Sequence, residues 1–186
     1  MLYEMLSYVV EIVAGLLAGF LLLRFWMQAL RVRPPQSLAL SIFQLTDWIV
    51  RPIRRIVPGF AGLDWASLIA AFFVAMIPAL LEVMMNGFFN TLLVLVLTSF
   101  RLLHWILYGL MGLLIMEAVL SFVNPHAPLA PLIRALNAPL LAPLRRIIPP
   151  IGGLDFSVLV AFLLLQLIGQ LLVRELPRVI MFIARM

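Results

Sequence analysis

The sequence has no cysteine and little charge, and both absences limit what the protein can be. Without cysteine there is no disulfide, no thiol nucleophile and no thiolate metal site. Charged residues make up 11% of the chain, whereas a soluble domain is about one quarter charged. Hydrophobic residues make up 65%, and the mean hydropathy is +1.17. These values indicate an integral membrane protein.

Motifs of the common enzyme classes are also missing. The chain has no Ser/His/Asp set, no glycine-rich phosphate loop and no metal-ligand spacing, so we expect no enzymatic activity, no cofactor and no metal site. The net charge is +5, and all 13 basic residues are arginine. Because no separate basic domain exists, we expect no nucleic-acid partner. Arginines beside apolar spans instead set topology and contact anionic lipid headgroups.

One stretch of the chain occurs twice. Residues 52–64 read PIRRIVPGFAGLD, and residues 143–155, which lie 91 positions later without a gap, read PLRRIIPPIGGLD. Eight positions are identical. A match at a fixed period indicates internal duplication. We therefore divide the chain into a first repeat, residues 1–90, and a second repeat, residues 91–186.

Each repeat contains two apolar segments of the length that crosses a bilayer, which is about 20 residues. We place spans at 5–30 and 65–81 in the first repeat and at 97–123 and 156–173 in the second, with an amphipathic tail at 174–186. No basic region precedes the first span, so we interpret it as a retained span and not as a signal peptide. The predicted fold is an all-α integral membrane protein with four transmembrane helices in two tandem repeats.

Between its two spans, each repeat has a shorter amphipathic segment. Residues 37–51 place Leu38, Ile42, Leu45 and Ile49 on one helical face, and the four positions 91 residues later are apolar again. A helix of this length is too short to span and is suited to the membrane interface, so we predict interfacial helices at 37–51 and 128–141. The Pro-Arg-Arg sequence should form a turn between each interfacial helix and the next span.

Residues 83–100 allow two interpretations. As a separate span they would make five helices and place the two repeated motifs on opposite faces of the membrane. The repeat alignment instead favours four spans, with residues 86–96 as an apolar connector and both arginine-rich loops on the cytoplasmic face. Three tail arginines would then lie outside, which argues against this orientation: Arg174, Arg178 and Arg185.

Several segments resemble a known family. The segment 21–28, the Asn124-Pro125 pair and especially residues 139–157 are similar to the YggT family of small bacterial inner-membrane proteins, which has YlmG relatives in cyanobacteria and plastids. The chain has the two-repeat form, although residues 59–61 depart from the family pattern. The resemblance implies a multi-pass protein of the bacterial inner membrane that serves osmotic-stress response or ion homeostasis. The alternative is a non-transporting scaffold or assembly factor for cytochrome maturation or cell division.

Two ionisable residues inside the spans are candidates for function, because such groups are costly in a membrane. Arg24 and Glu117 lie at similar depths in the first and third spans, so they could pair across the repeat interface. Such a pair could be a gate or ion relay, or it could fix the packing of the two halves. Arg24 could instead reach lipid phosphate alone. In the same way, Glu11, Gln28, Gln166 and Gln170 could line a polar path or join helices by hydrogen bonds.

The repeated motif contributes the remaining candidates. Arg54, Arg55, Arg145 and Arg146 should contact anionic headgroups or a membrane-protein partner, unless they serve as an orientation signal alone. Asp64 and Asp155 precede spans, so we interpret both as helix caps and not as catalytic acids.

Two weaker features complete the set of candidates. His104 has no second histidine within helical reach, so we interpret it as an interfacial residue and not as a haem ligand. Gly15 and Gly19 form a small-xxx-small pattern, which favours close helix packing within the chain or in a homo-oligomer.

Overall fold

The computed structural model describes residues 2–85, 89–148 and 155–184, and within these residues the chain forms six helices and no strand. Four helices are long and apolar enough to cross a membrane: α1 (Leu2–Ala29), α3 (Trp65–Met85), α4 (Thr91–Val123) and α6 (Phe156–Ala184). This confirms the prediction of an all-α protein with four spans. The residues expected to form an amphipathic tail continue α6 as far as Ala184.

The third span begins earlier than the repeat alignment predicts. The Asn90 side chain accepts hydrogen bonds from the backbone N–H groups of Leu92 and Leu93 at 2.9 and 3.2 Å. This cap starts α4 at Thr91, so residues 91–96 extend the span and do not form a connector. Residues 83–85 complete α3, and therefore 83–100 is not a separate span. Residues 86–88 of the predicted connector lie outside the described residues.

Two shorter helices lie between the spans, α2 (Gln36–Ile56) and α5 (Ala130–Ile147). Both continue through the Pro-Arg-Arg sequence, which forms the last helical turn and not the turn that we predicted. Arginine is favourable there because it complements the negative end of the helix dipole. Val57 and Ile148 are the C-cap residues of the two helices, and each comes just before a proline in the sequence.

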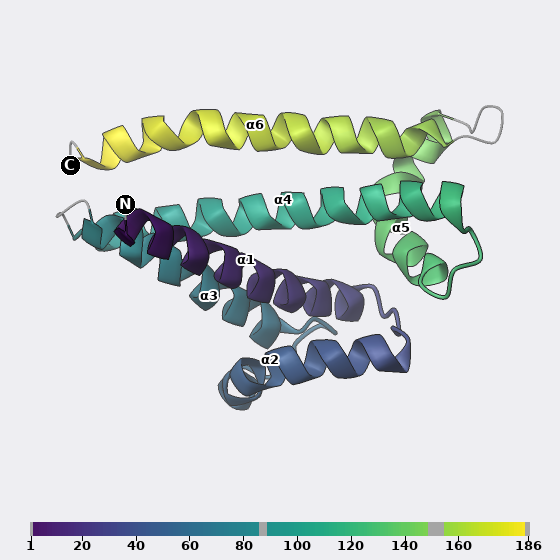
Figure 1. The fold of residues 1–186 in the computed structure, drawn as a ribbon, viewed down its shortest axis with the longest axis horizontal. Coiled ribbons are helices and arrows are strands. Elements are labelled where there is room, and N and C mark those ends of the chain that lie inside the picture. The colour runs from purple at the N-terminus through teal and green to yellow at the C-terminus, as the bar shows by residue number, and fades with distance from the viewer. Residues whose placement is uncertain (1, 86–88, 149–154, 185–186) are drawn as a thin grey trace.

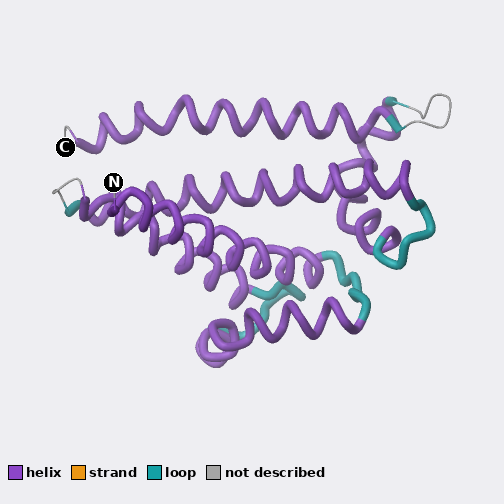
Figure 2. The backbone as a smooth tube through the Cα atoms, viewed as in Figure 1, coloured by secondary structure: helices purple, strands orange, loops and turns teal. Residues whose placement is uncertain are grey.

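The spans run side by side, with α4 between α6 and the pair formed by α1 and α3 (Figure 1). Both termini, the end of α3 and the start of α4 lie at one end of the molecule, which we call the terminal end. The helices α2 and α5 lie at the opposite end, which we call the arginine-rich end. Most of the described loops also lie at the arginine-rich end (Figure 2).

Small residues pack α1 against α3. Ala14 and Ala18 of α1 are buried in one cluster with Ala70, Ala71 and Val74 of α3. Gly15 faces α4, where an added Cβ would lie 3.4 Å from the Trp105 ring, whereas a Cβ at Gly19 would meet nothing within 4 Å. The close packing therefore depends on the alanines beside the glycine pattern.

The two repeats meet through an apolar contact at the arginine-rich end. Met27 of α1 and Ile42 of α2 are buried with Ile133 and Leu136 of α5. The indole N–H of Trp26 donates a hydrogen bond of 3.0 Å to the carbonyl of Leu136. This contact joins the halves without any charged group.

Candidate functional site

The first polar cluster lies at the arginine-rich end of the first repeat. Arg24 of α1 is buried, and its Nη1 donates to Thr46 Oγ1 at 2.8 Å and to Asp47 Oδ1 at 2.7 Å. Its Nε lies 3.4 Å from Asp64 Oδ2, and its guanidinium lies over the ring of Phe43. Arg24 therefore ties the first span to α2 and to the start of α3.

Asp64 completes the first polar cluster. It precedes the first residue of α3 and is almost fully buried. Ser67 donates to it through its side-chain Oγ at 2.6 Å and through its backbone N–H at 3.4 Å. Asp64 also accepts a hydrogen bond from Arg54, in the last turn of α2. One carboxylate thus caps a span and forms ion pairs with two arginines.

The second polar cluster occupies the corresponding place in the second repeat. Glu117 of α4 is buried and accepts from Arg145 Nη2 at 2.9 Å and from Asn137 Nδ2 at 2.7 Å. Arg145 Nε also donates to Asp155 at 2.7 Å. Asp155 accepts from the backbone N–H of Ser157 at 3.0 Å, which caps the start of α6. The same three elements are tied together as in the first repeat.

The clusters share three positions, because Asn137, Arg145 and Asp155 lie 91 residues after Thr46, Arg54 and Asp64. They differ in the residue that the long span contributes. The first cluster receives the cation Arg24, and the second receives the anion Glu117. The counterpart of Asp47, which pairs with Arg24, is Ala138. The two central charges do not occupy corresponding positions, because the counterpart of Arg24 is Ile115 and the counterpart of Glu117 is Trp26.

The predicted pair between Arg24 and Glu117 does not form. Each side chain makes its ion pairs within its own repeat. The prediction compared depth along the spans and overlooked Asp47 and Arg145, which α2 and α5 bring closer. A buried charge takes the nearest counter-charge that can also donate or accept a hydrogen bond.

The two Arg-Arg pairs divide between two roles. Arg54 and Arg145 form ion pairs that complete the polar clusters, although their side chains are 43% and 39% exposed. Arg55 and Arg146 are exposed, and neither forms an ion pair with another described residue. The second arginine of each pair therefore remains accessible to an external group.

Ion pairing shifts the pKa of groups at the surface of the arginine-rich end. Burial raises the pKa of Asp47 and of Asp155, but hydrogen bonds from Arg24 and Arg145 respectively lower both pKa values overall. Burial lowers the pKa of Arg145, and its bonds to Asp155 and Glu117 raise it overall. All three groups are therefore held in their charged forms.

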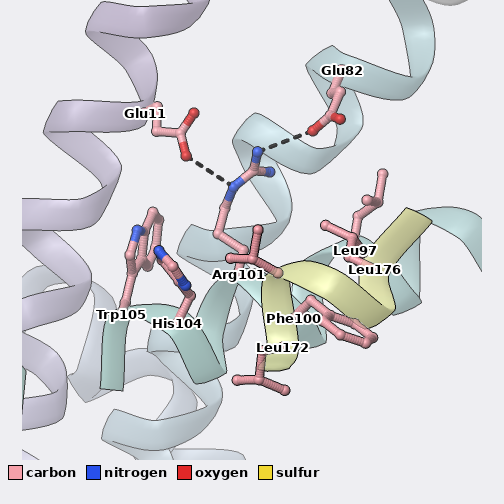
Figure 3. Close-up of a pocket in the computed structure, with 10 residues that line it drawn as sticks. Glu11, Glu82, Leu97, Phe100, Arg101, His104, Trp105, Leu172 and Leu176 are labelled. Carbon is pink, nitrogen blue, oxygen red and sulfur yellow. Dashed lines mark hydrogen bonds and ion pairs between the residues drawn. The ribbon is translucent and has the colours of Figure 1, made fainter. Parts of the chain in front are cut away.

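A third polar cluster, which the sequence analysis missed, lies near the terminal end (Figure 3). Arg101 of α4 is 3.3 Å from Glu11 of α1 and 3.0 Å from Glu82 of α3. His104 and Trp105 line the same pocket, whose volume is about 240 Å³. Arg101 Nη1 is buried and donates to no other described residue. The available signal was one cation and two anions in three different spans.

The charged clusters form two layers near the ends of the spans. Glu117 lies 16 residues after Arg101 on α4, which is about 24 Å along the helix. Glu82 lies 18 residues after Asp64, or about 27 Å along α3. The hydrocarbon core of a bilayer is about 30 Å thick. The charges that the sequence places within spans therefore lie near the two boundaries of the core.

Comparison with known proteins now gives the family. A family model described as CCB3/YggT matches residues 3–85 and, as a second copy, residues 96–176. The chain belongs to this family. An uncharacterised protein of Pseudomonas aeruginosa is 33% identical over 179 residues, which cover 91% of this chain and 88% of the relative. The uncharacterised YggT of Escherichia coli K12 is 32% identical over 171 residues, covering 89% and 87%.

A third relative agrees with this YggT assignment. A protein of Vibrio alginolyticus is 32% identical over 172 residues, which cover 87% of this chain and 89% of the relative. No solved structure matches the chain. The two family matches correspond to the two halves of the fold, so the internal duplication is a property that the family model recognises. The chain is a multi-pass YggT protein built from two tandem repeats.

Proposed function

We propose that this YggT protein is a non-transporting scaffold or assembly factor of the bacterial inner membrane. The observation that carries the proposal is that Arg24 and Glu117 form ion pairs in two separate clusters and not with each other. A relay at the repeat interface would need these charges to face one another or a shared aqueous path. Each is instead neutralised by the helix that packs against its own span.

The interior of the spans further supports a non-conducting role. No charged residue occurs at 12–23 in α1, at 65–81 in α3 or at 102–116 in α4. Ion pathways through membranes are lined by polar or ionisable side chains. A path enclosed by α1, α3 and α4 of one copy would therefore cross about 20 Å with little to replace the hydration shell of an ion.

The arginine-rich end has the chemistry of a docking face. Arg55 and Arg146 are exposed at the ends of α2 and α5, and Ile56 and Ile147 beside them are exposed as well. An arginine near an anionic membrane surface contributes about 1 kcal/mol. Two exposed cations, each next to an apolar side chain, suit anionic headgroups together with a membrane-protein partner.

We place the arginine-rich end in the cytoplasm, because cytoplasmic loops carry the excess of arginine. Both termini would then be periplasmic. A reporter that is active only in the cytoplasm should be inactive when fused after residue 186 and active when inserted between residues 124 and 129. The reverse activities would overturn this orientation.

In vivo photo-cross-linking tests the scaffold proposal. A probe in place of Ile56 or Ile147 should give a specific protein adduct, which the double variant Arg55→Ala/Arg146→Ala should lose at equal membrane levels. Arg178→Ala, which removes an exposed arginine of α6 near the terminal end, is the matched control and should keep the adduct. An adduct pattern that is the same in all variants would sink the proposal.

Ion homeostasis by direct transport is the second candidate, and one observation favours it. Gln166, Gln170 and Arg174 form an exposed stripe on α6 that several copies could assemble into a path. Cation flux in proteoliposomes tests this alternative. Under our proposal the wild type and Glu117→Gln both give the flux of protein-free vesicles. Flux that Gln170→Leu abolishes would establish the transport candidate instead.

A further inference from the structure

A polar groove lies between α4 and α6, within the depth of the membrane. His104 and Tyr108 line it from α4, and Gln166, Gln170 and Arg174 line it from α6. The groove has a volume of about 590 Å³, which is within the range of small-molecule binding sites. It adjoins the pocket of Arg101, because His104 and Val173 line both.

Apolar packing closes the groove above and below. Towards the arginine-rich end, Ala161 and Leu165 of α6 pack with Leu114 of α4. Towards the terminal end, Leu176 and Ile180 of α6 pack against Leu97 of α4 and its neighbours. Between these contacts, the two glutamines and Arg174 remain exposed. The groove is therefore a defined opening between two helices, and it faces sideways into the bilayer.

The first repeat contains no such opening at the same positions. The counterparts of Gln166, Gln170 and Arg174, which lie 91 residues earlier, are Ala75, Ala79 and Val83, and all three are buried. An exposed glutamine in hydrocarbon loses its hydrogen bonds with water, at a cost of several kcal/mol. These polar residues therefore require a polar occupant.

The lining defines the chemistry of that occupant. Arg174 supplies a positive charge, and the glutamine amides, the Tyr108 hydroxyl and His104 supply hydrogen-bond donors. No carboxylate lines the groove. Such a site favours an anion with several acceptor oxygens. Leu107 and Met111 line the groove as well, so it also offers apolar surface.

We propose that this groove binds the headgroup of an anionic phospholipid from the leaflet at the terminal end. Arg174 lies 19 residues after Asp155, about 28 Å along α6, which places it near the headgroup level. The lipid phosphate binds Arg174, and the ester oxygens accept hydrogen bonds from Gln170 and Tyr108. The acyl chains follow Leu107 and Met111 towards the bilayer centre.

A phospholipid suits the groove better than a soluble anion or a second protein copy. It reaches the lateral opening by diffusion within the membrane, whereas a free anion would have to cross hydrocarbon. The apolar contacts above and below the groove hold α4 and α6 together, so a second copy could cover the groove but could not insert a helix between them. The inference does not depend on the scaffold proposal, because it uses different residues at the opposite membrane boundary.

Native mass spectrometry with added phosphatidylglycerol tests the inference on the full chain. The key variant is Gln166→Ala/Gln170→Ala/Arg174→Val, which installs the residues of the first repeat. The wild type should retain one phosphatidylglycerol, and the triple variant should bind it about tenfold more weakly or worse. Arg178→Ala is one helical turn beyond the groove and should bind as the wild type does.

The single variant Gln170→Leu is included in case the triple variant misfolds. It should also retain phosphatidylglycerol more weakly than the wild type does. Its melting temperature without lipid should stay within a few degrees of that of the wild type. Equal retention of phosphatidylcholine and phosphatidylglycerol would overturn the proposal. So would displacement of the lipid by millimolar inorganic phosphate, or a dimer that the triple variant alone disrupts. Unchanged lipid binding in both groove variants would exclude the site.

Discussion

The two repeats solve the same packing problem in different ways. In the first repeat, α1 and α3 pack through alanines, and Ala79 of α3 is completely buried with Val94 and Leu97 of α4. In the second repeat, the residue that corresponds to Ala79 is Gln170, which lines an open groove between α4 and α6. The face of α3 that α4 covers therefore corresponds to a face of α6 that carries exposed polar groups.

The polar clusters at the arginine-rich end show the opposite behaviour. Their residues at the ends of the surface helices and before the second spans are the same in both repeats, Arg54 with Asp64 and Arg145 with Asp155. The difference lies in the burial of the aspartates, because Asp64 is 1% exposed and Asp155 is 30% exposed. The first cluster should therefore contribute more to the stability of the fold than the second does.

The largest expected effect distinguishes the two aspartates. Asp64→Ala removes a helix cap and leaves the buried Arg24 with one carboxylate fewer, so it should lower the free energy of unfolding by about 3 kcal/mol. Asp155→Ala should cost about 1 kcal/mol, because solvent reaches its site. Unfolding of both variants by titration with dodecyl sulfate, followed by circular dichroism, measures the difference. Equal losses would contradict the comparison.

A second pair of substitutions tests the packing of the spans. Ala18 is fully buried between α1 and α3, so Ala18→Leu should overpack the interface and cost about 2 kcal/mol. Its counterpart 91 residues later is Gly109, where an added Cβ would meet nothing within 4 Å. Gly109→Leu should therefore be close to neutral in the same titration. A larger loss for Gly109→Leu would show that α4 and α6 pack as α1 and α3 do.

The smallest expected effect is the dependence of stability on pH. The folded state lowers the pKa of Asp47 and Asp155 below their unfolded values, which are about 4. Their contribution is therefore complete above pH 4 and is lost as the pH falls through the lower folded-state values. The melting temperature in detergent should therefore fall as the pH is lowered below about 4. The Asp47→Asn variant should show a smaller decrease in melting temperature over this range. A melting temperature that rises on acidification would refute the prediction.

The sequence predicts the spans well because their hydropathy is a property of each segment alone. The apolar stretches before Arg24 and after Asp64 are long enough to span in any packing arrangement. The repeat also predicts which loops lie on the same face of the membrane. Neither signal fixes helix ends to a residue, since the Asn90 cap and the arginines in the last turn of α2 extend helices beyond the apolar pattern.

The partners of buried charges were harder to predict, because they depend on distances between helices. The similar depths of Arg24 and Glu117 along their spans suggested that the two side chains meet, but α2 and α5 bring Asp47 and Arg145 closer to them. Arg101 was missed for the same reason, since its partners come from α1 and α3. The groove was visible as two glutamines in a span, but their exposure follows from the separation of α4 and α6.

Cysteine accessibility tests the central claim, which is that the first repeat is closed where the second is open. The chain has no cysteine, so Ala79→Cys and Gln170→Cys each create a single thiol at corresponding positions. In detergent, a small polar thiol reagent should modify the Gln170→Cys variant rapidly and leave the Ala79→Cys variant unmodified until the protein unfolds. Modification of both variants at the same rate would contradict the account.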